Sequence, residues 1–201
     1  MIARRTAALC LALLIGPVAV TAAQVASPNL GDMPGGRYTL DRRQSSVTAT
    51  VTHMGVSLYT ARFDSADATL DFDANHPEAA KVRASVDPAT LDVGADYSRK
   101  FAEDFLQATR FPKITFVSTQ VLKGAGGQGT MTGDLTVMGV TKPVTFDVTF
   151  IGTGKELMPP QRPTAGFVAV AKLKRSDFGS TYLDNVVGDE VTIRIEGEFN
   201  R

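Results

Sequence analysis

The chain has 201 residues, of which 43% are hydrophobic and 21% charged, and its 21 Lys and Arg residues balance 21 Asp and Glu residues. This composition is that of a globular protein and excludes a disordered or collagen-like chain. The balanced charge argues against a nucleic-acid-binding protein, which needs a basic surplus to neutralise phosphates. The length is that of one domain with a substantial core.

Residues 1–23 have the features of a signal peptide. Arg4 and Arg5 form a short basic start, residues 7–15 are apolar, and Thr21-Ala22-Ala23 supplies the small residues that a signal peptidase recognises. The apolar run is too short to span a bilayer, which takes roughly 18 residues or more. Cys10 is the one cysteine and lies in this segment, so cleavage leaves no thiol for a disulfide, a metal site or a nucleophile. We therefore expect an exported chain.

A flexible lead containing Pro and Gly is expected over 24–36, and a single domain over 37–201. In that domain apolar and polar residues alternate with the period of a β-strand. The apolar faces are Val47-Ala49-Val51 with His53, Ala68-Leu70-Phe72, Val82-Ala84-Val86, Met131-Leu135-Val137, Val144-Phe146-Val148-Phe150 and Val191-Ile193-Ile195. One apolar and one polar face is typical of antiparallel sheets, and seven or eight such strands favour a sandwich or a closed barrel.

Three other segments carry local signals. One short helix is predicted over 97–106, where Phe101 and Phe105 lie four residues apart, and it ends before Pro112. Residues 124–129 match G-x-G-x-x-G, but a strand follows instead of the helix that a dinucleotide site needs, so they predict a hairpin turn. A long connection is expected over 152–166, either as a gate or as a long hairpin loop.

The sequence contains no convincing catalytic or metal-binding constellation. His53 and His76 are the only histidines, and no Gly-x-Ser-x-Gly motif is present. We therefore predict no enzyme, no catalytic residues, no metal site and no cofactor. For His53 two interpretations are open: a hydrogen-bonded histidine within the barrel wall, or a residue at a cavity mouth that contacts a ligand head group. The inward phenylalanines form either a packed core or the wall of a ligand cavity.

Four segments, in order along nearly the whole exported chain, resemble the YceI-like family. They are Tyr38-Thr39-Leu40-Asp41 with His53-Met54-Gly55 and Phe63, then residues 111–119 (FPKITFVST), 133–144 (GDLTVMGVTKPV) and 174–179 (KRSDFG). The resemblance implies an all-β fold, which we expect to be an eight-stranded antiparallel lipocalin-like barrel with one short helix packed near the barrel mouth. It also implies a periplasmic location and an apolar channel for a polyisoprenoid or similar long-chain amphiphile. Dimers occur in the family.

The predicted helix departs from the family pattern. The family's Arg-Asp-x-His-Leu motif is replaced by Tyr97-Ser98-Arg99-Lys100-Phe101, which lacks the histidine. Arg99 and Lys100 either contact an anionic head group or belong to a solvated helix face.

We therefore expect a periplasmic lipid-binding protein that carries or sequesters an isoprenoid-type lipid or quinone in its channel. Phe101 and Phe105 are expected to form an apolar lid, with His53 near the polar end. The residues expected to line the channel are Val47, Val51, Phe72, Phe116, Leu135, Phe146, Phe150 and Ile193. The alternative is a non-enzymatic interaction or stress-response module with a filled barrel, serving a membrane redox partner. A lipid hydrolase would need a nucleophile beside His53.

Overall fold

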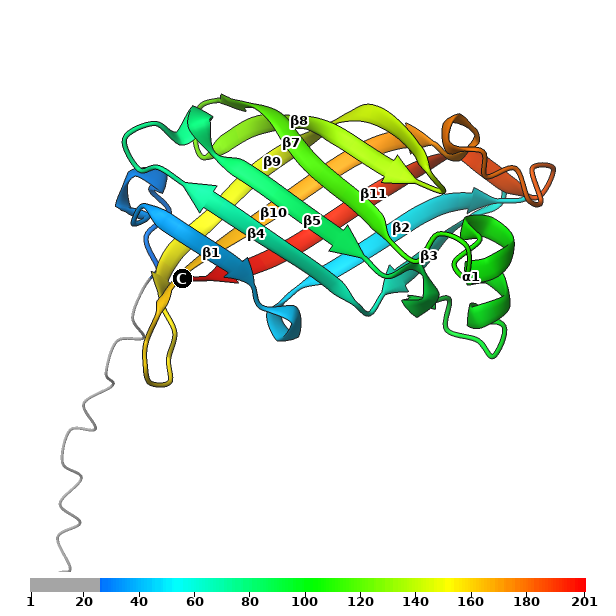
Figure 1. Ribbon diagram of the computed structural model, residues 1–201, viewed down its shortest axis with the longest axis horizontal. Helices are drawn as coiled ribbons and strands as arrows, with labels where there is room; N and C mark the ends of the chain where they lie inside the picture. Colours follow the sequence, from blue (N-terminus) through cyan, green and yellow to red (C-terminus); the bar gives the residue numbers. More distant parts are fainter. Residues whose placement is uncertain (1–25) are drawn as a thin grey trace, which may run out of the picture.

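Eleven β-strands form one antiparallel sheet in residues 26–201, which are the residues that the computed structural model describes (Figure 1). The predicted signal peptide over 1–23 therefore lies outside the described residues. One α-helix, α1 (Ser98–Leu106), and five short 3-10 turns complete the described part of the chain. The strands are β1 (Gly36–Leu40), β2 (Ser46–His53), β3 (Ser57–Phe63), β4 (Ala66–Phe72), β5 (Lys81–Val86), β6 (Leu91–Asp92), β7 (Ile114–Lys123), β8 (Gln128–Val137), β9 (Val140–Lys155), β10 (Pro163–Lys174) and β11 (Val187–Asn200).

The sheet closes into a barrel because β11 pairs with β1 as well as with β10. Thr39 lies opposite Asn200 and Leu40 opposite Phe199. Two short strands, placed end to end, take the place of one long strand at three neighbouring positions of the barrel wall. Next to β11 these are β1 and β2. The next position holds β4, which pairs with β1, and β3, which pairs with β2, and the third holds β5 and β6. Counted in this way, the barrel has eight strands joined as an up-and-down meander, which confirms the predicted fold.

Aspartate-capped turns break the wall between the paired short strands. The Asp41 carboxylate accepts the backbone N–H of Arg43 at 2.9 Å, and Asp87 accepts that of Ala89 at the same distance. Aspartate suits such turns because its side chain competes with the sheet for backbone N–H groups. The breaks separate the β1–β4–β5 part of the wall from the β2–β3–β6 part, beside which α1 packs.

Asp41 makes the first break sensitive to pH. Arg43 donates two side-chain hydrogen bonds to its carboxylate, at 3.0 and 2.7 Å, besides the backbone bond, and together these lower the pKa of Asp41 to about 2. A carboxyl whose pKa is lowered by folding stabilises the fold above its unfolded pKa near 4, and this contribution disappears as the pH falls through about 2.

We therefore expect Asp41→Asn to lower the free energy of unfolding at pH 6 and to have a much smaller effect near pH 2. Urea denaturation of both proteins at several pH values measures this difference. The control is Asp71→Asn, which removes an exposed carboxylate from β4. If the free energies of unfolding of wild type and Asp41→Asn differed by the same amount at pH 2 and pH 6, Asp41 would not be the group that titrates with the lowered pKa.

The predicted alternation is confirmed along the strands. On β9, Val144, Phe146 and Phe150 are buried, whereas Thr145 and Asp147 between them are exposed. Cross-strand register brings small inward residues together, since Ala49 faces Ala61 and Ala68 faces Ala84. The interior therefore combines large aromatic side chains with pairs of alanines.

The segment expected to be a flexible lead is instead packed on the barrel over its described residues, 26–36. Ser27 exchanges two backbone hydrogen bonds with Thr153, at 2.8 and 2.9 Å, and Met33 is buried beside Tyr38. The Tyr38 hydroxyl donates to the carbonyl of Pro34 at 2.7 Å, and burial raises the pKa of that phenol. The lead thus belongs to the core at one end of the barrel, because Met33 supplies a buried side chain that its short sequence pattern did not reveal.

The expected long connection over 152–166 is shorter in the structure. Strand β9 continues to Lys155 and β10 begins at Pro163, so only residues 156–162 connect them. Glu156 and Arg162 close this loop with an ion pair at 2.6 Å. Gly152, Gly154 and Gly166 lie within strands, and the sequence pattern missed them because glycines lack the side chains that mark alternation.

The helix and the glycine-rich turn agree with their predictions. Helix α1 begins at Ser98 and ends at Leu106, one residue inside the predicted start, and Gln107 follows in the left-handed conformation with φ 47°. Residues 124–127 connect β7 to β8 as a hairpin turn, with φ 62° at Gly126 and 76° at Gly127. Among residues 26–201, no helix is both long and apolar enough to cross a membrane.

Candidate functional site

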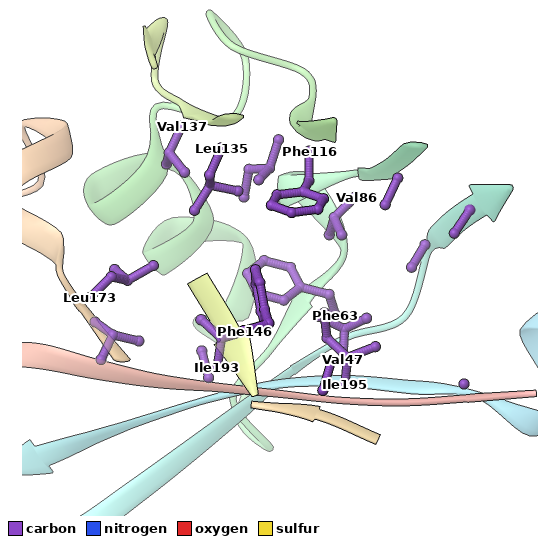
Figure 2. A pocket seen from close by; sticks show the side chains of 18 of the residues that line it. Val47, Phe63, Val86, Phe116, Leu135, Val137, Phe146, Leu173, Ile193 and Ile195 are labelled. Atoms are coloured by element: carbon purple, nitrogen blue, oxygen red, sulfur yellow. The ribbon is translucent and has the colours of Figure 1, made fainter. Parts of the chain in front are cut away.

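The barrel encloses a cavity of about 690 Å³. Figure 2 shows apolar side chains from opposite walls pointing toward it, with Phe116, Leu135 and Val137 on one side and Phe146, Ile193 and Ile195 on the other. The volume lies within the range of natural ligand sites. All eleven residues expected to contact a ligand line this cavity, although their role as ligand contacts stays a prediction.

Aromatic packing and cavity formation occur together in this barrel. The rings of Phe116 and Phe146 meet edge to face at 5.3 Å between centroids, and those of Phe150 and Phe167 lie 5.3 Å apart. The space remains because alanines occupy neighbouring inward positions. Those that line the cavity include Ala49, Ala61, Ala68, Ala84 and Ala169. Both interpretations of the inward phenylalanines therefore apply, since packed rings form the wall of an open cavity.

One side of helix α1 closes over the cavity with aromatic side chains. Phe101 packs on Phe105 at 5.5 Å, and Tyr97 on Phe101 at 4.8 Å; all three line the cavity. Phe105 also meets Tyr182, which lies between β10 and β11, edge to face at 5.1 Å. The contacts between these four aromatic rings connect α1 to the loop before β11. Tyr97 was not among the expected contacts, because its position at the helix start hid its inward direction.

His53 lies at the end of β2, where the cavity reaches the surface. Its side chain is exposed and also lines the cavity. The next residue, Met54, donates its backbone N–H to the carbonyl of Val186 at 2.7 Å, which ties this strand end to the loop before β11. The position matches a residue at a cavity mouth rather than one buried in the barrel wall. Contact between His53 and a head group stays a prediction.

Arg175 is a buried cation that was not among the expected site residues. It lines the cavity, and its guanidinium donates to the carbonyls of Ser180, Tyr182, Val187 and Gly188 at 2.8–3.1 Å. The same group lies 5.7 Å from the centroid of the Phe105 ring, within the range of a cation–π contact. Arg175 therefore holds the loop before β11 in its fold. One indication of its importance was present in the sequence, because Arg175 belongs to the 174–179 segment that resembles the family. The segment does not indicate which way the side chain points.

Arg99 and Lys100 lie outside the cavity. Both are exposed on α1, and neither lines the cavity. Lys100 forms an ion pair with Asp104, which raises the lysine pKa, and it lies 5.7 Å from the centroid of the Tyr182 ring. The structure thus matches the interpretation of a solvated helix face.

Fold and site together define a closed antiparallel barrel with an apolar interior cavity. The YceI-like domain model matches residues 38–199, and the chain belongs to that family. The chain is 37% identical over 145 residues to the protein YceI of Shigella flexneri, covering 70% of this chain and 74% of that protein.

Solved structures share the architecture. The crystal structure of BcnA from Burkholderia cenocepacia is similar with a TM-score of 0.70 at 27% identity, over 79% of this chain and 98% of that one. A polyisoprenoid-binding domain from Saccharophagus degradans, implicated in plant cell wall breakdown, is similar in fold with a TM-score of 0.56 at 15% identity. That match covers 81% of this chain and 97% of the domain.

Proposed function

We propose that this protein binds a long-chain amphiphile, of the polyisoprenoid or isoprenoid-quinone class, and carries or sequesters it with the tail inside the barrel. The apolar cavity of about 690 Å³ is the observation that supports this proposal. It is the reason to prefer a carrier over the alternative of a filled barrel that serves a membrane redox partner. The role is that of a binding protein without catalysis, and the proposed location is the periplasm, based on the signal-peptide features of residues 1–23.

The energetics favour a tail over a small polar ligand. Each methylene group buried from water contributes about 0.8 kcal/mol, so ten of them contribute about 8 kcal/mol. That amount corresponds to a micromolar dissociation constant before the costs of ordering the tail. An apolar wall discriminates poorly between tails of similar width, because hydrophobic contact has no direction. The polyisoprenoid-binding domain that shares this fold supports polyisoprenoids as the first ligands to test.

Native mass spectrometry of the exported protein, purified without detergent, tests this function. We expect a stoichiometric mass above that of the chain, and solvent extraction followed by lipid analysis should identify a long-chain amphiphile. A protein that carries no such mass and also fails to take up added ubiquinone or polyprenyl phosphate would contradict the proposal.

Ala84→Phe should reduce the space for the tail. Ala84 faces Ala68 across the sheet and Phe116 on β7, so a ring at this position extends into the cavity. We expect the retained lipid to fall about tenfold or to shift to a shorter tail in native mass spectra. Arg83→Phe is the matched control, because it places the same ring on the outer face of β5. Equal lipid retention by both variants would contradict the placement of the tail.

A further inference from the structure

The turn between β2 and β3 carries an unusual set of exposed apolar side chains. Met54 is 65% exposed, Val56 86% and Leu58 73%. No Asp, Glu, Lys or Arg occurs between Thr52 and Ala61, so no formal charge has to be desolvated if this tip enters an apolar phase. Large aliphatic side chains at a charge-free tip suggest a surface that is covered during function.

These side chains continue into the mouth of the cavity. Tyr59, Tyr97 and Leu183 line the cavity and are themselves 36–50% exposed. The Tyr59 hydroxyl donates to the carbonyl of Val93, which joins β3 to the segment before α1. Figure 1 shows the end of β2, helix α1 and the loop after β10 at one end of the barrel. We call the set of Met54, Val56, Leu58, Tyr59, Tyr97 and Leu183 the apolar rim.

We propose that the apolar rim inserts into the surface of a phospholipid bilayer, so that a lipid tail passes between the bilayer and the cavity without crossing water. This inference rests on the proposed function, since it gives the bound amphiphile its route. The β2–β3 tip enters the acyl-chain region with Met54, Val56 and Leu58. The tyrosines lie behind it, where rings with one apolar and one polar end suit the membrane interface.

A bilayer fits the rim better than a protein partner does. The tip is a single turn with aliphatic ends, and its lack of charge matches an uncharged acyl region rather than a polar interface. The opposite end of the barrel provides a comparison. Leu157 is 88% exposed there, but the Glu156–Arg162 ion pair closes its loop, and none of residues 156–162 lines the cavity. At the α1 end, by contrast, the exposed aliphatic side chains of the tip adjoin residues that line the cavity, Tyr59 among them.

The absence of tryptophan from the chain allows a direct test. Val56→Trp introduces one fluorophore at the tip, and Leu157→Trp introduces one at the opposite end. With phosphatidylcholine vesicles, with and without added phosphatidylglycerol, we expect a blue shift and quenching by brominated acyl chains for Val56→Trp. We expect neither change for Leu157→Trp. Little dependence on salt or on phosphatidylglycerol is expected, because insertion is apolar rather than electrostatic.

A loss-of-binding pair completes the test. Val56→Ser combined with Leu58→Ser should lower the vesicle partition coefficient about tenfold or more, whereas Leu157→Ser with Met158→Ser should change it less than about twofold. The inference would be overturned if the two double variants changed the vesicle partition coefficient equally. It would also be overturned if the wild-type protein did not bind vesicles. Native mass spectrometry separates the two proposals, since the Ser variants, whose cavity wall is unchanged, should still take up a lipid that is added directly to the purified protein. A protein that binds vesicles through the tip but takes up no lipid would overturn the proposed function alone.

Discussion

Phe146→Asp is expected to abolish lipid retention at neutral pH. Phe146 is buried on β9 against Phe116 and lines the cavity. A carboxylate there lies among the apolar side chains of the core and disfavours an apolar tail beside it. We expect retention by native mass spectrometry to fall more than about 100-fold at pH 8. Burial raises the pKa of a carboxyl group, so part of the retention should return at pH 5, where the group becomes neutral.

The neighbouring residue supplies the matched control for this prediction. Thr145 precedes Phe146 on the same strand and faces solvent. Thr145→Asp adds the same charge outside the barrel and should retain the lipid. Circular dichroism checks that both variants keep their strands. A folded Phe146→Asp protein with unchanged lipid would show that the tail does not occupy this part of the cavity.

Arg175→Met should be the most destabilising single change at the α1 end of the barrel. It removes a buried charged donor that serves four backbone carbonyls and leaves those carbonyls without their partner. Hydrogen bonds to charged groups contribute more than neutral ones, and unpaired buried acceptors are costly. We expect the free energy of unfolding, measured in urea, to fall by about 3–5 kcal/mol.

Arg175→Lys should recover only part of this loss, because one ammonium group cannot replace a planar fork that reaches four carbonyls. Lys172→Met is the control, since Lys172 is exposed and pairs with Glu190 on the surface. Its cost should stay below about 1 kcal/mol. A loss of similar size for Arg175→Met and Lys172→Met would show that the four carbonyls bond equally well to water.

Alternation along the chain predicted an antiparallel sandwich or barrel, because one buried and one wet face impose a period of two on the residues, and the family resemblance indicated the barrel. The same pattern placed Phe72 and Phe150 on the inner wall, where the structure has them. It could not predict that the wall is broken at Asp41 and Asp87, since alternation is read within each short strand and does not indicate which two strands share one position in the wall.

The cavity mouth was harder to predict than the wall. His53 was selected because it continued an inward series, but alternation does not indicate where a strand leaves the core. Arg175 follows a strand whose apolar residues gave no sign that a cation turns back toward four carbonyls of a later loop. Tyr97 and Leu183 belong to segments without a regular period, so only the three-dimensional structure brings them to the mouth.

The alanine pairs across β2–β3 and β4–β5 make the pairing of the strands independent of the volume of the cavity. Ala49, Ala61, Ala68 and Ala84 keep their places in the hydrogen-bonded ladders through their backbones, while their methyl groups determine how much room the interior has. A larger side chain at any of these positions narrows the bore without altering strand register. Under the proposed function, the size of the tail that fits can therefore change one residue at a time on an unchanged scaffold. The residues at these four positions should then limit which tails the proposed carrier accepts.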